Sequence, residues 1–556
     1  MCSKTLSFFS LYRHFSISTI LRKIPIRHRN LAVHEAQKAL TDYLHATRSF
    51  PFTYAELIGN NTLCSLSNLI AKVEFSPSTF SKSFQRVLRY HPINEFEVFF
   101  ESIGIEHHLV SGLLPDDKVF FSQDRSLFDA ACALSDFGFP WEKLGVLYLQ
   151  ESSIFGRSAA ELKSRLGELK GFGFGNVEVI GMCLAFPFVL SEESQEGVGI
   201  DELFSDLKLI FLDFGLGRFV EGDVDSWHEV CRKLRLFIDL IGYKGNLWEY
   251  IGRNKYKSIF IEYREEELVN KVKFFCRFGV KKEEVAQLIL LCPELLSLDL
   301  ENPVINVLKL LKHFGLSSKD LDEISQKFAH VLGRNKLVNL PNVMRALGLQ
   351  EWFFDKINGG HHQLLTDYIA KYPNEDQDKD YQDGLRRIQI SRARVHSISK
   401  LKFLHGLGFG ENALTIDVLN HLHGTSSELQ ERFDCLLCSR IEFSKLCMMV
   451  RRTPRILNQN SETIKRKVNF FNQEMGTSLS YLETFPAMLH YHLEDRIIPR
   501  YRFHKWLTEK GLCCKKYSIR SMIANNEKKF VARVFKIHPA APKHWFEKFC
   551  HIKLPM

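Results

Sequence analysis

The stretch LVNKVKFFCRFG at residues 268–279 carries the pattern that decides the fold of this chain. Leu268, Val272 and Phe275 stand at i, i+4 and i+7, and Gly279 follows at i+11. These spacings place three apolar side chains on one stripe of a helix, and the glycine supplies the left-handed residue that closes a helix end. The pattern occurs three more times: Leu127, Ala131, Leu134 and Gly138; Leu162, Leu166, Leu169 and Gly173; Val304, Leu308, Leu311 and Gly315.

The period of this pattern predicts a helical repeat array. Gly138 and Gly173 are 35 residues apart, and Gly279 and Gly315 are 36 apart. Such periods are typical of arrays in which each unit buries its apolar face against its neighbours. A second phrase, proline followed three residues later by leucine, recurs at Pro187, Pro293, Pro454 and Pro486. Because proline breaks the preceding helix, each unit is predicted to hold a helix, a proline-set turn or short helix, and a longer helix ending in glycine. The expected fold class is an all-α solenoid.

Composition and charge narrow the kind of protein. The 556 residues are 45% hydrophobic and 25% charged, as in a folded soluble chain and not a disordered one. No stretch approaches the ~20 apolar residues that cross a bilayer. From Leu385 to the end there are 30 Lys and Arg against 14 Asp and Glu, whereas residues 35–384 carry a net charge of −13. The basic third is expected to attract polyanions. The alternative is that basic helix faces only keep a large protein soluble.

Five segments follow from these changes in composition. Residues 1–34 are predicted to be a transit peptide, and residues 80–370 to be acidic-to-neutral repeats. Residues 371–384, which include the acidic run NEDQDKDYQD, read as a solvated linker. Basic repeats are expected over residues 385–512, and a basic cap or tail over residues 513–556.

The amino terminus has the composition of an organellar address. Residues 1–34 contain six Lys and Arg, five serines and no acidic residue, as a transit peptide requires. The segment RHFS at residues 13–16 is similar to a mitochondrial cleavage site. We expect import into the mitochondrial matrix or nucleoid, with the chloroplast as the alternative destination. A disordered basic arm that binds nucleic acid directly is the other interpretation.

Motifs of catalysis and cofactor binding are missing from the sequence. There is no Walker A phrase, no H-E-x-x-H and no G-x-S-x-G. The glycine clusters at residues 171–175 and 406–410 follow no predicted strand, so we read them as helix ends. Cys435 and Cys438 form a C-x-x-C without the matched second pair that a zinc site needs. We therefore expect no catalytic residue, no cofactor, no metal and no enzymatic activity, although an unfamiliar active site stays open.

The basic third contains our candidate nucleic-acid-binding residues. Helical spacing would group them within successive repeats, where they could follow a phosphate backbone and provide affinity without sequence information. The aromatic residues Tyr501, Phe503 and Trp506 could stack on bases, but residues at such spacing are more often core contacts. The candidates are Arg451, Arg452, Arg455, Lys465, Arg466, Lys467, Arg496, Arg500, Arg502 and Lys505.

The chain resembles the mitochondrial transcription termination factor (mTERF) family. The resemblance rests on the Pro-x-x-Leu and Phe-Gly or Leu-Gly phrases of residues 268–349, and on RTPRIL (452–457), RIIPRY (496–501) and Lys510-Gly511. It covers roughly residues 84–512 and is looser at Pro92, which is followed by Glu95 where the phrase expects leucine. The divergent first half and the long linker are more similar to plant members. The resemblance implies a superhelical solenoid whose concave basic face holds duplex DNA or structured RNA.

The resemblance also implies a role in organellar transcription termination, transcript processing or intron splicing. The competing hypothesis is a scaffold that docks other organellar gene-expression proteins on the acidic middle of the chain. Both could hold, one on each half. We expect a monomer with no membrane insertion, and the sequence leaves open whether its partner is DNA or RNA.

Overall fold

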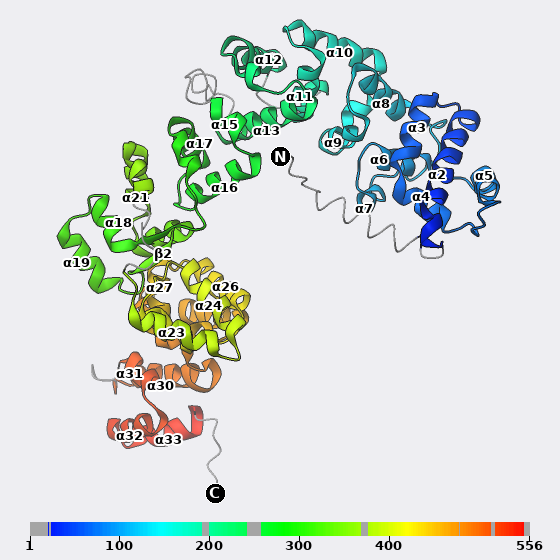
Figure 1. The fold of residues 1–556 in the computed structure, drawn as a ribbon. Helices are drawn as coiled ribbons and strands as arrows, with labels where there is room; N and C mark the ends of the chain where they lie inside the picture. The colour runs from blue at the N-terminus through cyan, green and yellow to red at the C-terminus, as the bar shows by residue number, and fades with distance from the viewer. Residues whose placement is uncertain are drawn as a thin grey trace. The chain divides into compact units, whose positions relative to one another are not determined.

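The computed structural model describes residues 21, 24–191, 199–241, 257–367, 376–476, 479–512 and 518–549. Almost every element in these ranges is a helix (Figure 1). The strands among them are β1 (Val304–Asn306) and β2 (Arg334–Lys336), which pair antiparallel. The chain divides into two compact units, residues 1–267 and 268–556. The predicted all-α fold of stacked helical repeats is confirmed.

The first unit begins with short helices packed around α2 (Ile26–Asp42). This helix contacts α3 (Phe52–Asn61), α4 (Leu63–Ile70) and α5 (Phe80–Tyr90), and it buries Ala32 and Ala36. Residues 26–34 of the expected transit peptide are therefore the first half of a packed helix, and a cut after residue 34 would divide it. The candidate cleavage site at residues 13–16 lies outside the described residues.

Longer repeats complete the first unit. Contacts join α8 to α10 and α11 to α13. The further helices are α6 (Glu95–Ser102), α7 (His107–Val110), α8 (Ser126–Phe137), α9 (Leu144–Gln150), α10 (Ala159–Gly171), α11 (Asn176–Ala185), α12 (Ile200–Lys208), α13 (Val224–Ile241) and α15 (Lys257–Glu262).

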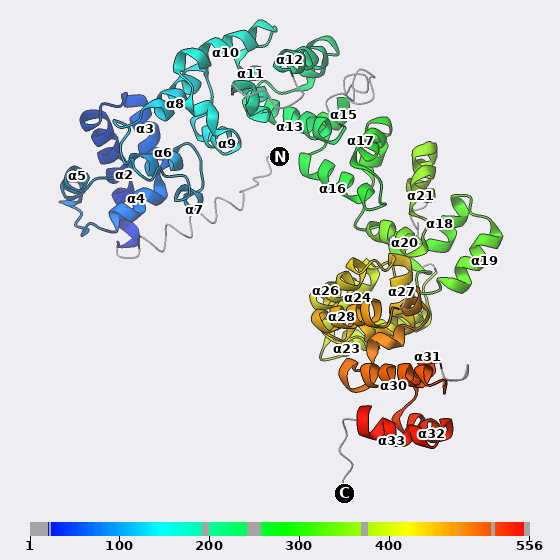
Figure 2. The same ribbon diagram turned by 180° about the vertical axis from the view of Figure 1, so that it is seen from behind.

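The second unit continues the repeats in two layers. The helices α24 (Arg394–Gly406), α26 (Ser426–Cys438) and α28 (Ser461–Asn469) contact one another in sequence, as Figure 2 shows. Opposite them, α25 (Ala413–His421), α27 (Phe443–Arg452) and α29 (Leu479–Thr484) form the other layer. Before them come α16 (Glu265–Cys276), α17 (Lys282–Leu291), α18 (Val307–His313), α19 (Ser318–Lys327), α20 (Leu340–Leu347), α21 (Gln350–Lys356), α22 (Gln363–Asp367) and α23 (Lys379–Ile390).

Both sequence phrases form the structures predicted for them. Gly279 follows α16 with a φ of 85°, and Gly138 follows α8 with a φ of 120°. The prolines begin short 3₁₀ turns directly after helices: η5 (Pro187–Leu190), η10 (Pro293–Ser297), η13 (Pro454–Leu457) and η15 (Pro486–His490). In each turn the leucine that follows the proline is buried. The glycines of the other repeats also have positive φ: Gly173, Gly315, Gly408, Gly476 and Gly511.

Two details differ from the predictions. Val304 belongs to β1, so the helix of the fourth copy starts at Val307 and buries Val307, Leu310 and Leu311, while Leu308 is exposed. The pairing with β2, some 30 residues along the chain, replaces the first helical turn there. Residues 379–384, expected to be linker, instead begin α23, which is capped by Asp378 and buries Tyr381. The apolar stripe of α23 draws these polar residues into a helix.

The carboxyl-terminal segment forms a cap on the array. The helix α30 (Ile498–Glu509) packs against α31 (Ile519–Ala524), and α32 (Glu527–Ile537) and α33 (Ala540–His544) follow. Their shared core contains Phe503, Leu507, Phe530 and Trp545. None of the helices in the described residues is long and apolar enough to cross a membrane.

Candidate nucleic-acid interface

Arg500 is occupied inside the protein and is not available to a ligand. Its side chain is only 2% exposed. One guanidinium nitrogen donates to the carbonyl oxygens of Met522 at 2.8 Å and Asn525 at 2.6 Å, and the other pairs with the carboxylate of Glu527. The guanidinium also lies 4.3 Å from the ring centre of Phe530. The structure removes Arg500 from the candidate contacts, because these donors serve the end of α31 and the start of α32.

Lys467 and Arg496 have similar internal partners. The Lys467 ammonium is buried and donates to the carbonyl oxygen of Leu489 at 2.9 Å and to the Gln459 side chain. Burial lowers the pKa of Lys467 to about 8. Arg496 is half-buried and donates to the carbonyl oxygens of residues 523, 524 and 525 at 2.8–3.1 Å. Lys467 is therefore also removed from the candidate nucleic-acid contacts, and most donors of Arg496 are used in hydrogen bonds to the carbonyl oxygens of residues 523–525.

These hydrogen bonds follow an arrangement that recurs along the chain. In each case a Lys or Arg donates to a backbone carbonyl 22 to 27 residues later, where a helix or proline turn ends. A cation at this place satisfies orphaned carbonyls and complements the helix dipole. The donors, hereafter the capping cations, are Arg165, Lys233, Lys271, Lys400, Arg432, Lys467, Arg496 and Arg500.

A sequence pattern accompanies this arrangement of capping cations, although the spacing of the repeats alone did not reveal the arrangement. Arg165 and Arg432 stand 25 residues before the leucine of a Pro-x-x-Leu phrase, and Lys467 stands 22 residues before another. Part of the positive charge of the basic third is thus structural.

Five of the predicted residues remain accessible. Arg452, Arg455, Lys465, Arg502 and Lys505, hereafter the free cations, are exposed. None of their side chains makes a hydrogen bond or ion pair with another described residue. The remaining two candidates are partly engaged. Arg451 donates to the carbonyl oxygen of Lys327 at 3.0 Å, and Arg466 pairs with the exposed carboxylate of Glu494.

The proline turns bring charges from successive repeats together. The turns η13 and η15 are in contact, and His490 lies at the end of η15. The pKa of His490 is lowered by burial first, and then by the positive charges of Arg455, Lys467 and Arg496. This edge, formed where the helices α25, α27 and α29 end, is hereafter the proline-turn edge. It presents positive potential from two adjacent repeats.

The aromatic residues of α30 are core contacts, as we preferred. Phe503 is fully buried, and Trp506 packs against the same cluster. The Tyr501 hydroxyl donates to the carbonyl oxygen of Glu474 at 2.8 Å. They hold the cap to the array.

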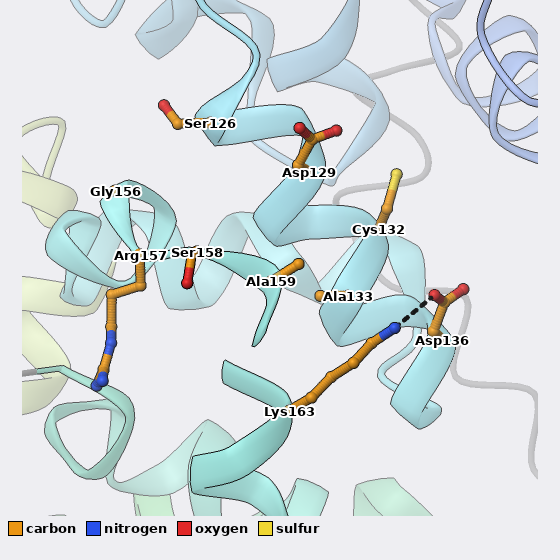
Figure 3. A pocket seen from close by; sticks show the side chains of 10 residues that line it. All are labelled: Ser126, Asp129, Cys132, Ala133, Asp136, Gly156, Arg157, Ser158, Ala159 and Lys163. Atoms are coloured by element: carbon orange, nitrogen blue, oxygen red, sulfur yellow. Dashed lines mark ion pairs between the residues drawn. The ribbon is translucent and has the colours of Figure 1, made fainter. Parts of the chain in front are cut away.

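A polar pocket of about 510 Å³ lies between α8 and α10 in the first unit (Figure 3). Its Lys163 and Asp136 form an ion pair at 3.5 Å, drawn as a dashed line. Asp136 also accepts a hydrogen bond from the Tyr54 hydroxyl. Burial raises the pKa of the Cys132 thiol to about 12, so this thiol is not ionised near neutral pH. The described contacts of the lining groups include no nucleophile–base pair.

Metal-ligating side chains are scattered over the part of the chain that the structure describes. There, no cluster of three or more His, Cys, Asp or Glu residues is placed to hold an ion. Cys435 lies on α26 and is partly buried, and its Sγ is 3.6 Å from the carbonyl oxygen of Ser461.

The family model described as mTERF matches residues 241–366 and 389–531 of the chain. The chain is 51% identical to an Arabidopsis thaliana protein named "Transcription termination factor MTEF18, mitochondrial", over 98% of this chain and 97% of that relative. It is 27% identical to "Transcription termination factor MTERF15, mitochondrial" of the same plant, over 18% of this chain and 23% of that relative. No solved structure matches.

Proposed function

Because the chain belongs to the mTERF family, and is thus a regulator of organellar gene expression, we propose that it acts by binding nucleic acid in mitochondria. The proposed partner is duplex DNA or base-paired RNA of the organelle. The proposed process is transcription termination, after which both relatives are named. Transcript processing and intron splicing are the other processes that the same binding would serve.

The free cations carry this proposal. Arg452 and Arg455 lie at the end of α27 and in η13, Lys465 lies on α28, and Arg502 and Lys505 lie on α30. They are distributed over consecutive repeats, and they have no partner within the described protein to neutralise them. Side chains of this kind release condensed counterions from a phosphate backbone when they bind it. They give affinity and register, and base-specific recognition would need further contacts.

The test compares two triple charge reversals in the full chain. The first is R452E/R455E/R502E on the candidate interface. The control is K82E/R86E/R89E on α5 of the first unit, where three basic side chains are likewise exposed. Both variants change the net charge equally, so a difference between them reports location and not total charge.

We expect the interface variant to bind a 30-base-pair duplex at least about tenfold more weakly, and the control to stay within about threefold. The slope of log K against log salt should be smaller for the interface variant, by about 0.9 for each phosphate that is no longer neutralised. Fluorescence anisotropy over a salt series measures both. Equal weakening in the two variants, or no weakening in either, would contradict the proposed interface.

A protein scaffold is the alternative for the first unit, favoured by the acidic balance of residues 35–384. A stoichiometric protein partner that survives nuclease and high salt would support it. Crosslinking of the protein to mitochondrial nucleic acid, followed by sequencing, would then decide among termination, processing and splicing.

A further inference from the structure

The junction of α23 and α24 is an exposed basic part of the second unit that the candidate interface does not include. Residues 391–393 connect the two helices, and every residue from 386 to 396 except Ile388 is exposed. Within this junction lie Arg387, Ile390, Arg392, Arg394 and Val395, hereafter the α23–α24 corner. It was not among the sites expected from the sequence.

The positive charge of the corner is not neutralised by acidic residues nearby in the sequence. Residues 384–410 contain four arginines and two lysines, but no Asp or Glu. Arg386 pairs with Asp383 at 3.2 Å in the preceding turn. Arg387, Arg392 and Arg394 make no hydrogen bond or ion pair through their side chains with another described residue. Three guanidinium groups are therefore available within eight residues.

The corner also exposes apolar surface. Ile390 is 87% exposed and Val395 is 83% exposed, the highest values among the large apolar residues of the described chain. Single exposed apolar residues are ordinary, but two of them with three arginines at one exposed turn form a surface that is apolar and cationic together. Contact with a partner would remove this apolar area from water.

The corner lies next to the proline-turn edge in the fold. Lys400 of α24 donates to the carbonyl oxygen of Leu422 at 2.9 Å, and the hydroxyls of Ser399 and Ser426 are 2.7 Å apart. The first half of α24 therefore lies where α25 ends. The turn η13 joins the same edge, because the Asn458 side chain donates to the carbonyl oxygen of His421 at 2.8 Å. A ligand that extends from Arg452 and Arg455 along this edge would thus reach the corner.

We propose that the α23–α24 corner binds a nucleotide whose base has left the stack, as at a bulge, a loop or a strand end. This inference rests on the proposed nucleic-acid binding. Arg387, Arg392 and Arg394 contact the phosphates on either side of that nucleotide, and Ile390 and Val395 cover the face of its base. Apolar side chains placed against unstacked bases, with Arg on the neighbouring phosphates, are a known way to hold deformed nucleic acid.

The choice of an unstacked base follows from the two aliphatic side chains. A fully stacked duplex presents phosphates, sugars and base edges to an exposed turn, and these surfaces would satisfy only the arginines. The face of an unstacked base is apolar and flat, so burying Ile390 and Val395 against it adds to the binding free energy. An acidic protein is the other partner of suitable charge. Continuity with the free cations favours nucleic acid.

The experiment uses the full chain and two pairs of probes. Each pair has one sequence, either as a DNA duplex or as an RNA hairpin, with a fully paired member and a member that carries one bulged nucleotide. The variant I390S/V395S removes the apolar pair and keeps every charge. The variant R392Q/R394Q removes charge and keeps the apolar pair. All four side chains are exposed, so both variants should keep the thermal unfolding midpoint of the native chain.

We expect the native chain to prefer the bulged probe by at least about fivefold, in DNA, in RNA or in both. I390S/V395S should reduce this preference to less than about twofold and leave affinity for the paired probe unchanged within about twofold. R392Q/R394Q should weaken both probes by about three- to tenfold. The DNA and RNA arms show which nucleic acid supplies the unstacked base.

Three results would overturn the inference: no preference in the native chain, a preference that survives I390S/V395S, or loss of a stoichiometric protein partner as the only effect of that variant. Failure of the proposed function is distinguishable, because the native chain would then bind neither probe in a way that R452E/R455E/R502E weakens.

Discussion

Replacing Arg500 by alanine separates a structural role from a ligand-binding role, and Arg502 provides the matched control. The two arginines are two residues apart on α30. Arg500 is 2% exposed and bonded to the end of α31, whereas Arg502 is exposed without a partner in the described protein. We expect R500A to loosen the carboxyl-terminal cap and R502A to leave it intact.

The size of the effect follows from the partners that Arg500 holds. R500A leaves the carbonyl oxygen of Met522 without its side-chain donor, takes one of two donors from the carbonyl oxygen of Asn525, and removes the guanidinium from the ring of Phe530. Hydrogen bonds to charged groups contribute about 1.5–3 kcal/mol each but are not additive. The Glu527 carboxylate that loses its partner is half exposed and can be hydrated, so the lost hydrogen bonds dominate, and we expect the local opening of α31 and α32 to become easier by about 3 kcal/mol.

Hydrogen exchange measures this opening directly. Since 1.4 kcal/mol is a factor of ten, amides of α31 and α32 should exchange at least about 100-fold faster in R500A. In R502A they should exchange as in the native chain, while duplex binding weakens. The opposite pattern, with native exchange and a roughly tenfold weaker duplex affinity in R500A, would refute the capping role and restore Arg500 as a ligand contact.

Two further predictions concern the interior of the second unit. His330 is fully buried without a hydrogen bond to either ring nitrogen in the described protein, and burial lowers its pKa to about 3, helped by the charge of Arg451. The folded pKa lies below that of the unfolded chain, so the protein should lose stability as pH falls below about 6.5, by about 2 kcal/mol at pH 5. H330F should show less of this loss in urea unfolding at pH 7.5 and 5.0, and an identical loss would contradict the assignment. A Cβ on Gly410 would stand 2.2 Å from the carbonyl oxygen of Leu332, whereas one on Gly406 meets nothing within 4 Å. G410A should therefore lower the free energy of unfolding by about 1–3 kcal/mol. G406A should raise the free energy of unfolding by about 0.4–1 kcal/mol. Equal effects of the two substitutions would show that the backbone around residue 410 is not closely packed against that of residue 332.

The repeat architecture was predictable because its signals are local. Gly279 closes α16 and Pro293 begins η10 through the properties of single residues, and neither depends on distant partners. The departures have distant causes. Val304 is in a strand because residues 334–336 pair with residues 304–306, and no local pattern announces that partner.

The candidate interface was predictable only in part for the same reason. Helical spacing groups Arg500 with Arg496 correctly, but it does not show that α31, further along the chain, brings its carbonyl oxygens to them. Arg502 and Arg500 look alike in the sequence, but they differ in the residues that the fold packs against them. The α23–α24 corner was missed because its arginines fall beside an acidic run that reads as linker, and not within a Pro-x-x-Leu repeat.

The capping cations also determine where this chain can be cut or shortened. In the second unit their bonds span residues 271–298, 400–422, 432–457, 467–489 and 496–525, and these intervals do not overlap. Each interval is a closed segment that carries its own donor and acceptor. Fragment boundaries or deletions placed in the connections at residues 423–425, 458–460 or 491–492 would leave every such segment whole and would cut no helix. A boundary inside an interval would leave a Lys or Arg without its carbonyl. Repeats of this protein are therefore best swapped or removed with boundaries in those connections, and not at the prolines or glycines that mark the repeats in the sequence.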